Sequence, residues 1–482
     1  MTRNHSAPQR HHSARQRLAR TLITSASVLA VASFATGAAL AADLGASCCA
    51  DLEDRIAELE ATTARKGNRK LSLRISGQVS QAVLSFDDGR EQNIYQVSNS
   101  NSSDRFRFDG STTIGPGLMA GYYLEFSTDV ASSVAVSQTV DDSGNGGVSL
   151  RQSLWYIDSK RWGAISVGLG APATDDLLNY SLAGTGIAAS ADTSLVGTNL
   201  FTRDSATGDL NALSSGNTIS LRWNRFVPQL DTRRANIVRY DSPVLAGFAV
   251  SAAWGEDDIF DIALRYGRRW NGLRVAFGAG YFENHEEAGD VFGWPRGSDA
   301  AATGNTEIRE FKGSASVLHE PTGLFLSGAY LHREFAGGNL GTQTFACFSS
   351  GDAQQLRATT GIGCSSRPDF DYYHLSAGIK IDPFRLGYTS FYGEYARSED
   401  AITGLNVSVG SAVGGDVDYV TSSTMQIWGV GVVQHISAAQ MDLFLSYRKL
   451  SADVKGFESN GNRITAPLED ADVVMAGSRI RF

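Results

Sequence analysis

The chain has 482 residues and carries 42 lysines and arginines against 51 aspartates and glutamates, a formal net charge of −9. No group of basic residues resembles a nucleic-acid-binding face, so a nucleic-acid partner is not expected. Beyond residue 42, no apolar run approaches the roughly 20 residues that a transmembrane helix needs. A membrane location would therefore require a closed β-barrel, the other architecture that satisfies every backbone polar group in lipid.

The amino terminus has the pattern of an export signal. Five arginines precede the first acidic residue, Asp43, and an apolar run covers residues 22–42. These arginines are Arg3, Arg10, Arg15, Arg17 and Arg20. Serine, threonine and glycine dilute the apolar run, which makes a permanent membrane helix the weaker alternative. We expect a signal peptide over residues 1–41. Its removal leaves 37 basic and 51 acidic residues, a formal net charge of −14.

A short helical segment is expected next, within a periplasmic stretch at residues 42–70. Leu52, Ile56 and Leu59 recur at spacings of four and three with charges between them, as in a coiled coil. Because so short a helix is marginal alone in water, a coiled coil would need several copies held together, as in a trimer. A surface helix or a periplasmic tail explains the pattern equally well.

From Leu71 to Phe482 the dominant pattern has a period of two. Leu71 and Leu73 alternate with Ser72 and Arg74, and similar segments of about ten residues recur between tight turns and long polar loops. The sixteen expected strands cover residues 71–79, 103–111, 118–128, 149–158, 164–169, 235–241, 247–255, 259–270, 273–284, 307–319, 323–334, 370–381, 386–397, 420–434, 441–450 and 468–482. An even number suits a bacterial barrel, whose two chain ends lie on the periplasmic side.

This pattern predicts an all-β fold, a sixteen-stranded antiparallel transmembrane β-barrel over residues 71–482. Aromatic residues lie at segment ends, where membrane interfaces favour them. The alternative, a β-sandwich, does not explain the many charged residues on the polar face.

Three stretches resemble the general porins of alphaproteobacteria. The first runs from Cys49 to Glu60 and into residues 70–79, and the second runs from Trp155 through Gly170. The third is the ending Ser478-Arg479-Ile480-Arg481-Phe482, which is similar to the signal recognised by the outer-membrane assembly machinery. The resemblance implies a homotrimer with three pores, in contact with outer-membrane lipid and lipopolysaccharide. It also implies that the loop after the fifth strand, residues 170–234, folds inward and narrows the lumen.

Charges on the inner face and on that loop are candidates for the pore constriction. If the apolar face meets lipid, strand alternation turns a set of arginines toward the lumen. These basic candidates are Arg74, Arg105, Arg107, Arg151 and Arg239, and Gln78 shares their face. The loop offers the acidic candidates Asp175, Asp176, Asp192, Asp204 and Asp209. Opposed charges would set a transverse field that orients hydrated solutes, which favours passive diffusion of small hydrophilic solutes and ions.

The remaining motifs point to no chemistry. Cys347 and Cys364 in one long loop are a disulfide candidate in an oxidising compartment, and Cys48 and Cys49 could link chains or stay free. No catalytic cluster, metal site or cofactor is predicted. A channel selective for sugars, phosphate or dicarboxylates, and more remotely a barrel enzyme or an adhesin, are the alternative functions.

Overall fold

In the computed structural model, the described residues are 71–129, 131–141, 147–212, 219–255, 258–285, 307–336, 369–403, 407–408, 417, 419–458 and 462–482. The expected signal peptide (1–41), the helical stretch (42–70) and all four cysteines lie outside these ranges.

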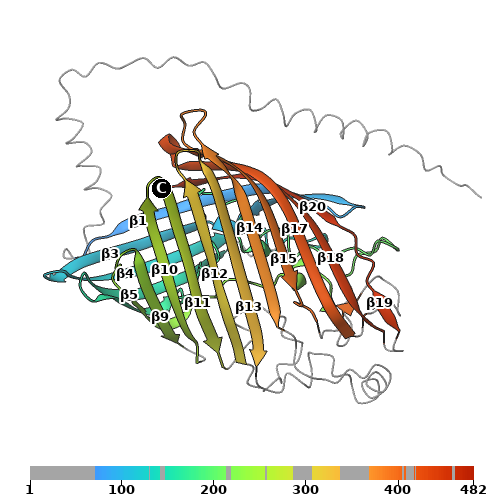
Figure 1. Cartoon of the computed structure of the whole chain (residues 1–482), viewed down its shortest axis with the longest axis horizontal. Helices are drawn as coiled ribbons and strands as arrows, with labels where there is room; N and C mark the ends of the chain where they lie inside the picture. Colours follow the sequence, from blue (N-terminus) through green and yellow to red (C-terminus); the bar gives the residue numbers. More distant parts are fainter. Residues whose placement is uncertain are drawn as a thin grey trace, which may run out of the picture. The chain divides into compact units, whose positions relative to one another are not determined.

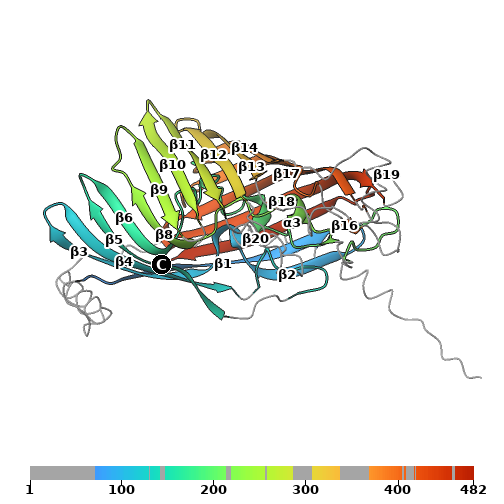
Figure 2. The ribbon, with the colours of Figure 1, turned by 90° about the horizontal axis from the view of Figure 1, so that it is seen from below.

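Sixteen strands follow one another around a closed antiparallel ring (Figures 1 and 2). They are β1 (Arg74–Asp87), β3 (Arg105–Gly115), β4 (Leu118–Asp129), β5 (Gly147–Ser159), β6 (Gly163–Gly170), β8 (Ala235–Asp241), β9 (Phe248–Gly255), β10 (Phe260–Trp270), β11 (Leu273–Asn284), β12 (Glu307–His319), β13 (Leu324–Ala336), β14 (Phe370–Ile381), β15 (Thr389–Glu399), β17 (Tyr419–Ile436), β18 (Met441–Phe457) and β20 (Ala471–Arg481). Each strand pairs with the next, and β20 closes the ring on β1 from Gln78↔Arg481 to Asp87↔Asp472. The predicted sixteen-stranded barrel is therefore confirmed.

The neighbour of β1 on its other side is interrupted. β2 (Gln92–Ser98) pairs with one half of β1 and β3 with the other half. Between them the chain leaves the ladder and forms a short 3-10 helix, η1 (Ser100–Ser102). This departure places η1 beside lumenal side chains, as described below.

Turn chemistry explains the strand connections at one end of the barrel. Between β10 and β11, Asn271 and Gly272 adopt φ values of 47° and 79°, and Trp270 pairs directly with Leu273. Positive φ at both central positions is the two-residue hairpin turn that follows the twist of the strands. We call this the turn end, because the long connections all lie at the opposite loop end.

Smaller elements belong to the connections at the loop end. They are η2 (Thr193–Leu195), β7 (Ile219–Ser220), α3 (Trp223–Phe226), β16 (Val407–Ser408) and β19 (Arg463–Thr465), with η3 (Ser437–Ala439) at the turn end. Strand β7, after β6, pairs in parallel with β16, after β15. Among the described residues, no helix has both the length and the apolar character needed to cross a membrane.

Alternation along the strands separates an apolar exterior from the interior. On β1, Val79 and Val83 are 54% and 50% exposed, whereas Ala82 and Leu84 are 4% and 0% exposed. On β17, Trp428 is also more than half exposed. Exposed apolar side chains on the outer face are what a lipid-facing barrel surface requires.

The interior is not polar everywhere. Beside β17, β18, β20 and β1, inward side chains such as Met425, Phe444 and Val473 are buried in one cluster with Trp223 and Phe226 of the long loop. The simple expectation of an apolar exterior and a polar interior is therefore wrong on this side. The reason is that the loop presents its own apolar surface to the inside of the wall.

Candidate functional site

The connection between β6 and β8 covers residues 171–234, and its described parts, residues 171–212 and 219–234, lie inside the ring; we call these parts the lumen loop. Its α3 lies among the wall strands in Figure 2, and its polar groups bond to inward-facing side chains of many strands. The bonds to the wall and to the η1 connection join Leu177 to Ser314, Leu182 to Ser316, Ala183 to Ser390, Ile187 to Asn99 and Ala191 to Tyr372. The predicted inward folding of this loop is confirmed.

The outgoing limb of the loop, residues 171–178, is held by two arginines of the wall. Arg239 on β8 donates from Nη1 to the carbonyl oxygens of the first two residues of the limb, each at 3.0 Å. Arg265 on β10 donates from Nη2 to the carbonyl oxygens of Ala173 at 2.5 Å and Asp175 at 3.2 Å. Bonds from charged donors are stronger than neutral ones, so the limb is anchored firmly to the wall.

Two glycines on β11 let the outgoing limb approach. A Cβ atom at Gly278 would lie 2.8 Å from Cδ2 of Leu177, and one at Gly280 would lie 2.7 Å from Cδ1 of the same leucine. Next to this contact, the amide and hydroxyl of Thr174 donate to the Asp261 carboxylate at 2.6 and 2.7 Å. Any larger side chain at either glycine would therefore push the limb toward the centre of the lumen.

The returning limb, residues 227–234, is clamped to β12 by Lys312. The ammonium group of Lys312 is fully buried and donates to the carbonyl oxygen of Leu230 at 3.2 Å and the hydroxyl of Thr232 at 2.7 Å. It also lies 3.4 Å from the Asp231 carboxylate and 3.2 Å from that of Glu310. Two carboxylates therefore balance this buried charge.

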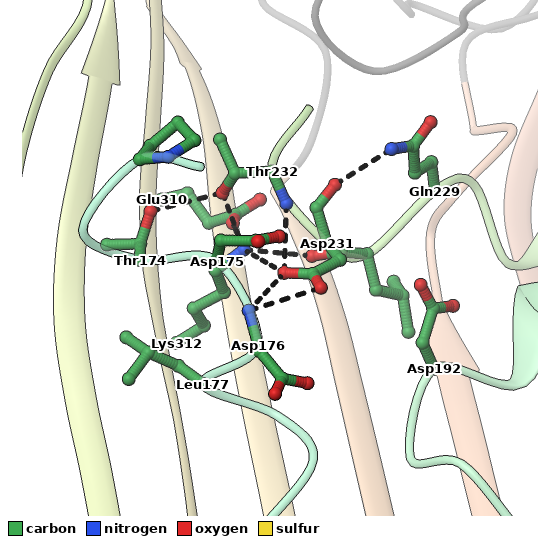
Figure 3. Close-up of polar contacts among 12 residues, drawn as sticks. Thr174, Asp175, Asp176, Leu177, Asp192, Gln229, Asp231, Thr232, Glu310 and Lys312 are labelled. Carbon is green, nitrogen blue, oxygen red and sulfur yellow. Dashed lines mark hydrogen bonds and ion pairs between the residues drawn. The ribbon is translucent and has the colours of Figure 1, made fainter. Parts of the chain in front are cut away.

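Asp231 also joins the two limbs. Its carboxylate oxygens accept the amide of Asp176 at 3.0 and 3.2 Å, so the outgoing limb is tied to the returning one. Figure 3 shows Asp175 and Asp231 beside Lys312, the backbone amide of Asp176 bonded to Asp231, and Asp192 apart from them. Asp176 is exposed, and the Asp231 side chain is 23% exposed, so water reaches this acidic group.

The charge of the acidic group depends on its surroundings. Desolvation inside the barrel raises the pKa of Asp175 to about 8, and the neighbouring Asp231 and Asp176 add to this shift. The positive charges of Arg234 and Lys312 oppose it. For Asp192, burial raises the pKa to about 6.

We predict that stability falls as pH rises. The ordinary pKa of these carboxyl groups is 3.8, so between roughly pH 4 and pH 8 the folded chain keeps protons that the unfolded chain has released. The free energy of unfolding should decrease through this window and level off above it. Denaturant midpoints of the refolded barrel across the window measure the effect. Asp175→Asn should remove most of the decrease in the free energy of unfolding at the high-pH end of this window. If stability in this variant depends on pH as it does in the wild type, the raised pKa of Asp175 is contradicted.

Three of the predicted wall arginines gather around Glu125 on β4, a residue that the sequence interpretation missed. Arg107 and Arg151 lie 2.5 and 2.8 Å from its carboxylate, and Arg105 lies 3.9 Å away. A register shift opposite Glu125 accounts for Arg151, because this extra residue in β5 turns its side chain inward. The Glu125 side chain is fully buried, whereas the side chains of Arg105, Arg107 and Arg151 are 23%, 34% and 19% exposed.

The other predicted residues occupy separate places. Arg74 begins β1 with a side chain 74% exposed and pairs with Asp109 at 2.9 Å. Asp192 is buried and caps η2 by accepting the amide of Ser194 at 3.1 Å.

Asp204 and Asp209 lie together in a turn of the lumen loop. The Asp204 carboxylate accepts the amides of Ala206 and Thr207, and its backbone amide donates to the carbonyl oxygen of Asp209. This turn contacts Leu468, in the connection before β20. Strand alternation could have identified Glu125 and Lys312 as inward-facing, but it carries no information about their partners.

Within the described residues, one group outside the lumen could hold a metal ion. Ligand atoms of His332, Glu334 and Asp369 lie within 4.8 Å of one another at the loop end of β13 and β14, where both carboxylates are exposed. His332 already pairs with Asp371 at 3.0 Å.

A closed antiparallel barrel with an apolar outer face and a charged, loop-lined interior defines the class of β-barrel channels of the outer membrane. Residues 26–463 match the family model described as Gram-negative porin. The chain therefore belongs to the Gram-negative porin family, and it forms a passive channel for small hydrophilic solutes and ions in the outer membrane.

Several solved structures match most of the chain at low sequence identity. The anion-selective porin from Comamonas acidovorans shares 16% identity over 86% of this chain and 100% of its own, with a TM-score of 0.49. OmpT of Vibrio cholerae in its trimer form shares 14% identity over 86% and 99%, with a TM-score of 0.46. Salmonella typhi OmpF in complex with daunomycin shares 12% over 86% and 98%, with a TM-score of 0.44. No curated protein matches the sequence.

Proposed function

We propose that this porin is a general diffusion channel whose narrowest point lies between the arginine cluster of β3 and β5 and the acidic outgoing limb of the lumen loop. The observation that carries the proposal is that side chains on both sides are accessible to water. Asp176 is exposed, and Arg105, Arg107 and Arg151 are partly exposed. The positive charge of Arg105, in the arginine cluster, acts on Asp176, as does that of Arg265, which anchors the outgoing limb itself. A field between the two sides would orient hydrated solutes and disfavour apolar ones.

Arg239 and Asp175 belong to the same proposal. Arg239 anchors the start of the outgoing limb, and Asp175 stands beside Asp176 on it. Both residues therefore belong to the side of the proposed constriction that the outgoing limb forms: Asp175 is part of the limb, and Arg239 holds its first residues.

We further propose a homotrimer of the alphaproteobacterial general porin type, surrounded by outer-membrane lipid and lipopolysaccharide. The resemblance of the amino-terminal, β5–β6 and carboxy-terminal stretches supports it, together with the exposed apolar side chains of the outer face. Light scattering of the refolded protein in detergent would give the number of copies.

Conductance and solute entry test the channel. Refolded protein should give stepwise ion conductance in planar bilayers, and swelling of loaded vesicles should slow as the added solute becomes larger, without saturation. Gly278→Val should push Leu177 and Tyr180 inward and lower both the conductance and the largest solute admitted. Gly267→Val is the matched control, because a Cβ atom at Gly267 has no heavy atom within 4 Å. Absence of conductance in folded protein would contradict the function, and saturable entry of one solute would favour a selective channel.

A further inference from the structure

A second cluster of the wall repeats the pattern found around Glu125. Asp442 on β18 is 1% exposed, and Arg479 and Arg481 of β20 lie 2.7 and 3.3 Å from its carboxylate. His435 lies 2.7 Å from the same carboxylate on the other side. The side chains of Arg479 and Arg481 are 20% and 42% exposed to solvent.

The two clusters meet at η1 and the residue after it. Arg479 donates from Nη1 to the hydroxyl of Ser102 at 2.8 Å, and Arg151 donates from Nη1 to the hydroxyl of Ser103 at 3.3 Å. Arg105 donates from Nε to the carbonyl oxygen of Ser103 at 3.2 Å. The departure of the chain between β2 and β3 therefore brings the guanidinium groups of β3, β5 and β20 into one continuous row.

Burial is one-sided in this row. Glu125 and Asp442 are 0% and 1% exposed, so their carboxylates lie behind the guanidinium groups that bind them. Two buried carboxylates bind these five arginines, and Asp109, which is paired with Arg74, also acts on Arg107. The part of the row that water contacts consists of guanidinium groups. An ion in the lumen therefore meets a net positive wall, although the chain as a whole carries a formal net charge of −9.

We propose that the channel prefers small anions, which pass along an arginine track formed by Arg105, Arg107, Arg151, Arg479 and Arg481. This inference rests on the proposed channel function and names its solute class, small inorganic and carboxylate- or phosphate-bearing anions. Guanidinium groups suit such solutes because their donors match oxyanions in geometry and are weakly hydrated. Arg479 and Arg481 extend the track from the constriction toward the turn end.

The acidic limb opposes the track only in part. Asp176 is exposed, but the carboxyl of Asp175 has its pKa raised to about 8 by desolvation and is largely protonated near neutral pH. Asp231 is paired with the Lys312 ammonium group at 3.4 Å. The two limbs together therefore present less negative charge to the lumen than Asp175, Asp176 and Asp231 suggest.

The sign of the reversal potential tests the proposal on the unmodified protein. With refolded wild-type protein in a bilayer between two KCl concentrations, the potential should show that chloride permeates more readily than potassium. Arg479→Gln with Arg481→Gln should lower the chloride-to-potassium permeability ratio by about twofold to fivefold, as expected for one or two charges acting through water. Lys160→Gln with Arg161→Gln removes two exposed charges from the β5–β6 turn and should leave the ratio near the wild-type value.

The outcomes separate the two proposals. Folded protein without conductance overturns the channel function itself. Conductance with a potassium preference, or with no preference, overturns the anion track and leaves the channel function standing. If the double variant does not refold, Arg107→Gln on the Glu125 side replaces it and should lower the ratio in the same direction; an unchanged ratio would count against the track.

Discussion

Lys312→Met is expected to destabilise the barrel by about 3–5 kcal/mol, the cost typical of removing one partner from a buried charge network. The lysine is fully buried, and without it Glu310 keeps only its contact with Arg333 at 2.6 Å. The returning limb would also lose its bonds through Leu230 and Thr232, so the lumen loop should loosen. Urea unfolding of the refolded protein, followed by tryptophan fluorescence, measures the free energy.

Lys449→Met is the matched control. Lys449 lies 3.1 Å from Asp470, but both side chains are about half exposed, at 49% and 48%. Exposed ion pairs are screened by water and contribute little to stability, so this variant should unfold close to the wild-type midpoint. Equal losses in the two lysine variants would show that burial does not decide the effect. The Lys312 variant should also show larger or noisier single-channel currents, because the loop is less firmly held.

Arg448→Met is expected to have an effect of similar size at another part of the wall, between β15 and β18. Arg448 and Glu394 are 3% and 1% exposed and lie 2.7 Å apart, and His374 lies 3.1 Å from the same carboxylate. Removing the guanidinium group leaves a buried carboxylate with only the imidazole beside it, which should cost about 3–5 kcal/mol. The bond from Arg448 to the Ser190 carbonyl oxygen, at 3.5 Å, would be lost as well.

A double-mutant cycle separates the charge from the packing. Arg448→Met combined with Glu394→Gln should be more stable than Arg448→Met alone, because no unpaired charge is then buried. Glu394→Gln alone leaves the guanidinium group unpaired and should also be strongly destabilising. Additive losses in the double variant would mean that the pair does not interact energetically, contrary to the short distance between the two side chains.

Much of the barrel was predictable because its pairings are local. Strands such as β10 and β11 are joined by a two-residue turn, so alternation and turn residues together determine where each begins and which face meets lipid. The predicted boundaries differ mainly at the loop end. There β1 continues to Asp87 and β18 to Phe457, because pairing extends beyond the apolar stretch that the sequence pattern reveals.

The lumenal contacts were not predictable from the same patterns. Alternation turns Glu125, Lys312 and Arg479 inward, but Lys312 bonds to a residue 80 positions away and Arg479 to one 377 positions away. On β17, β18 and β20 several inward positions are apolar, because the lumen loop covers an apolar inner surface there, so polarity alone does not identify the inner face of these strands.

The amino-acid sequence by itself therefore determined the membrane barrel, its strand order and its inward arginines, because these follow from period, turn chemistry and the requirement that backbone groups be satisfied in lipid. Only the tertiary structure decided which charges meet and which remain in contact with water. The path of the described parts of the lumen loop depends on many weak contacts between distant segments. This path, with the departure of the chain at η1, brings the lumenal charges together.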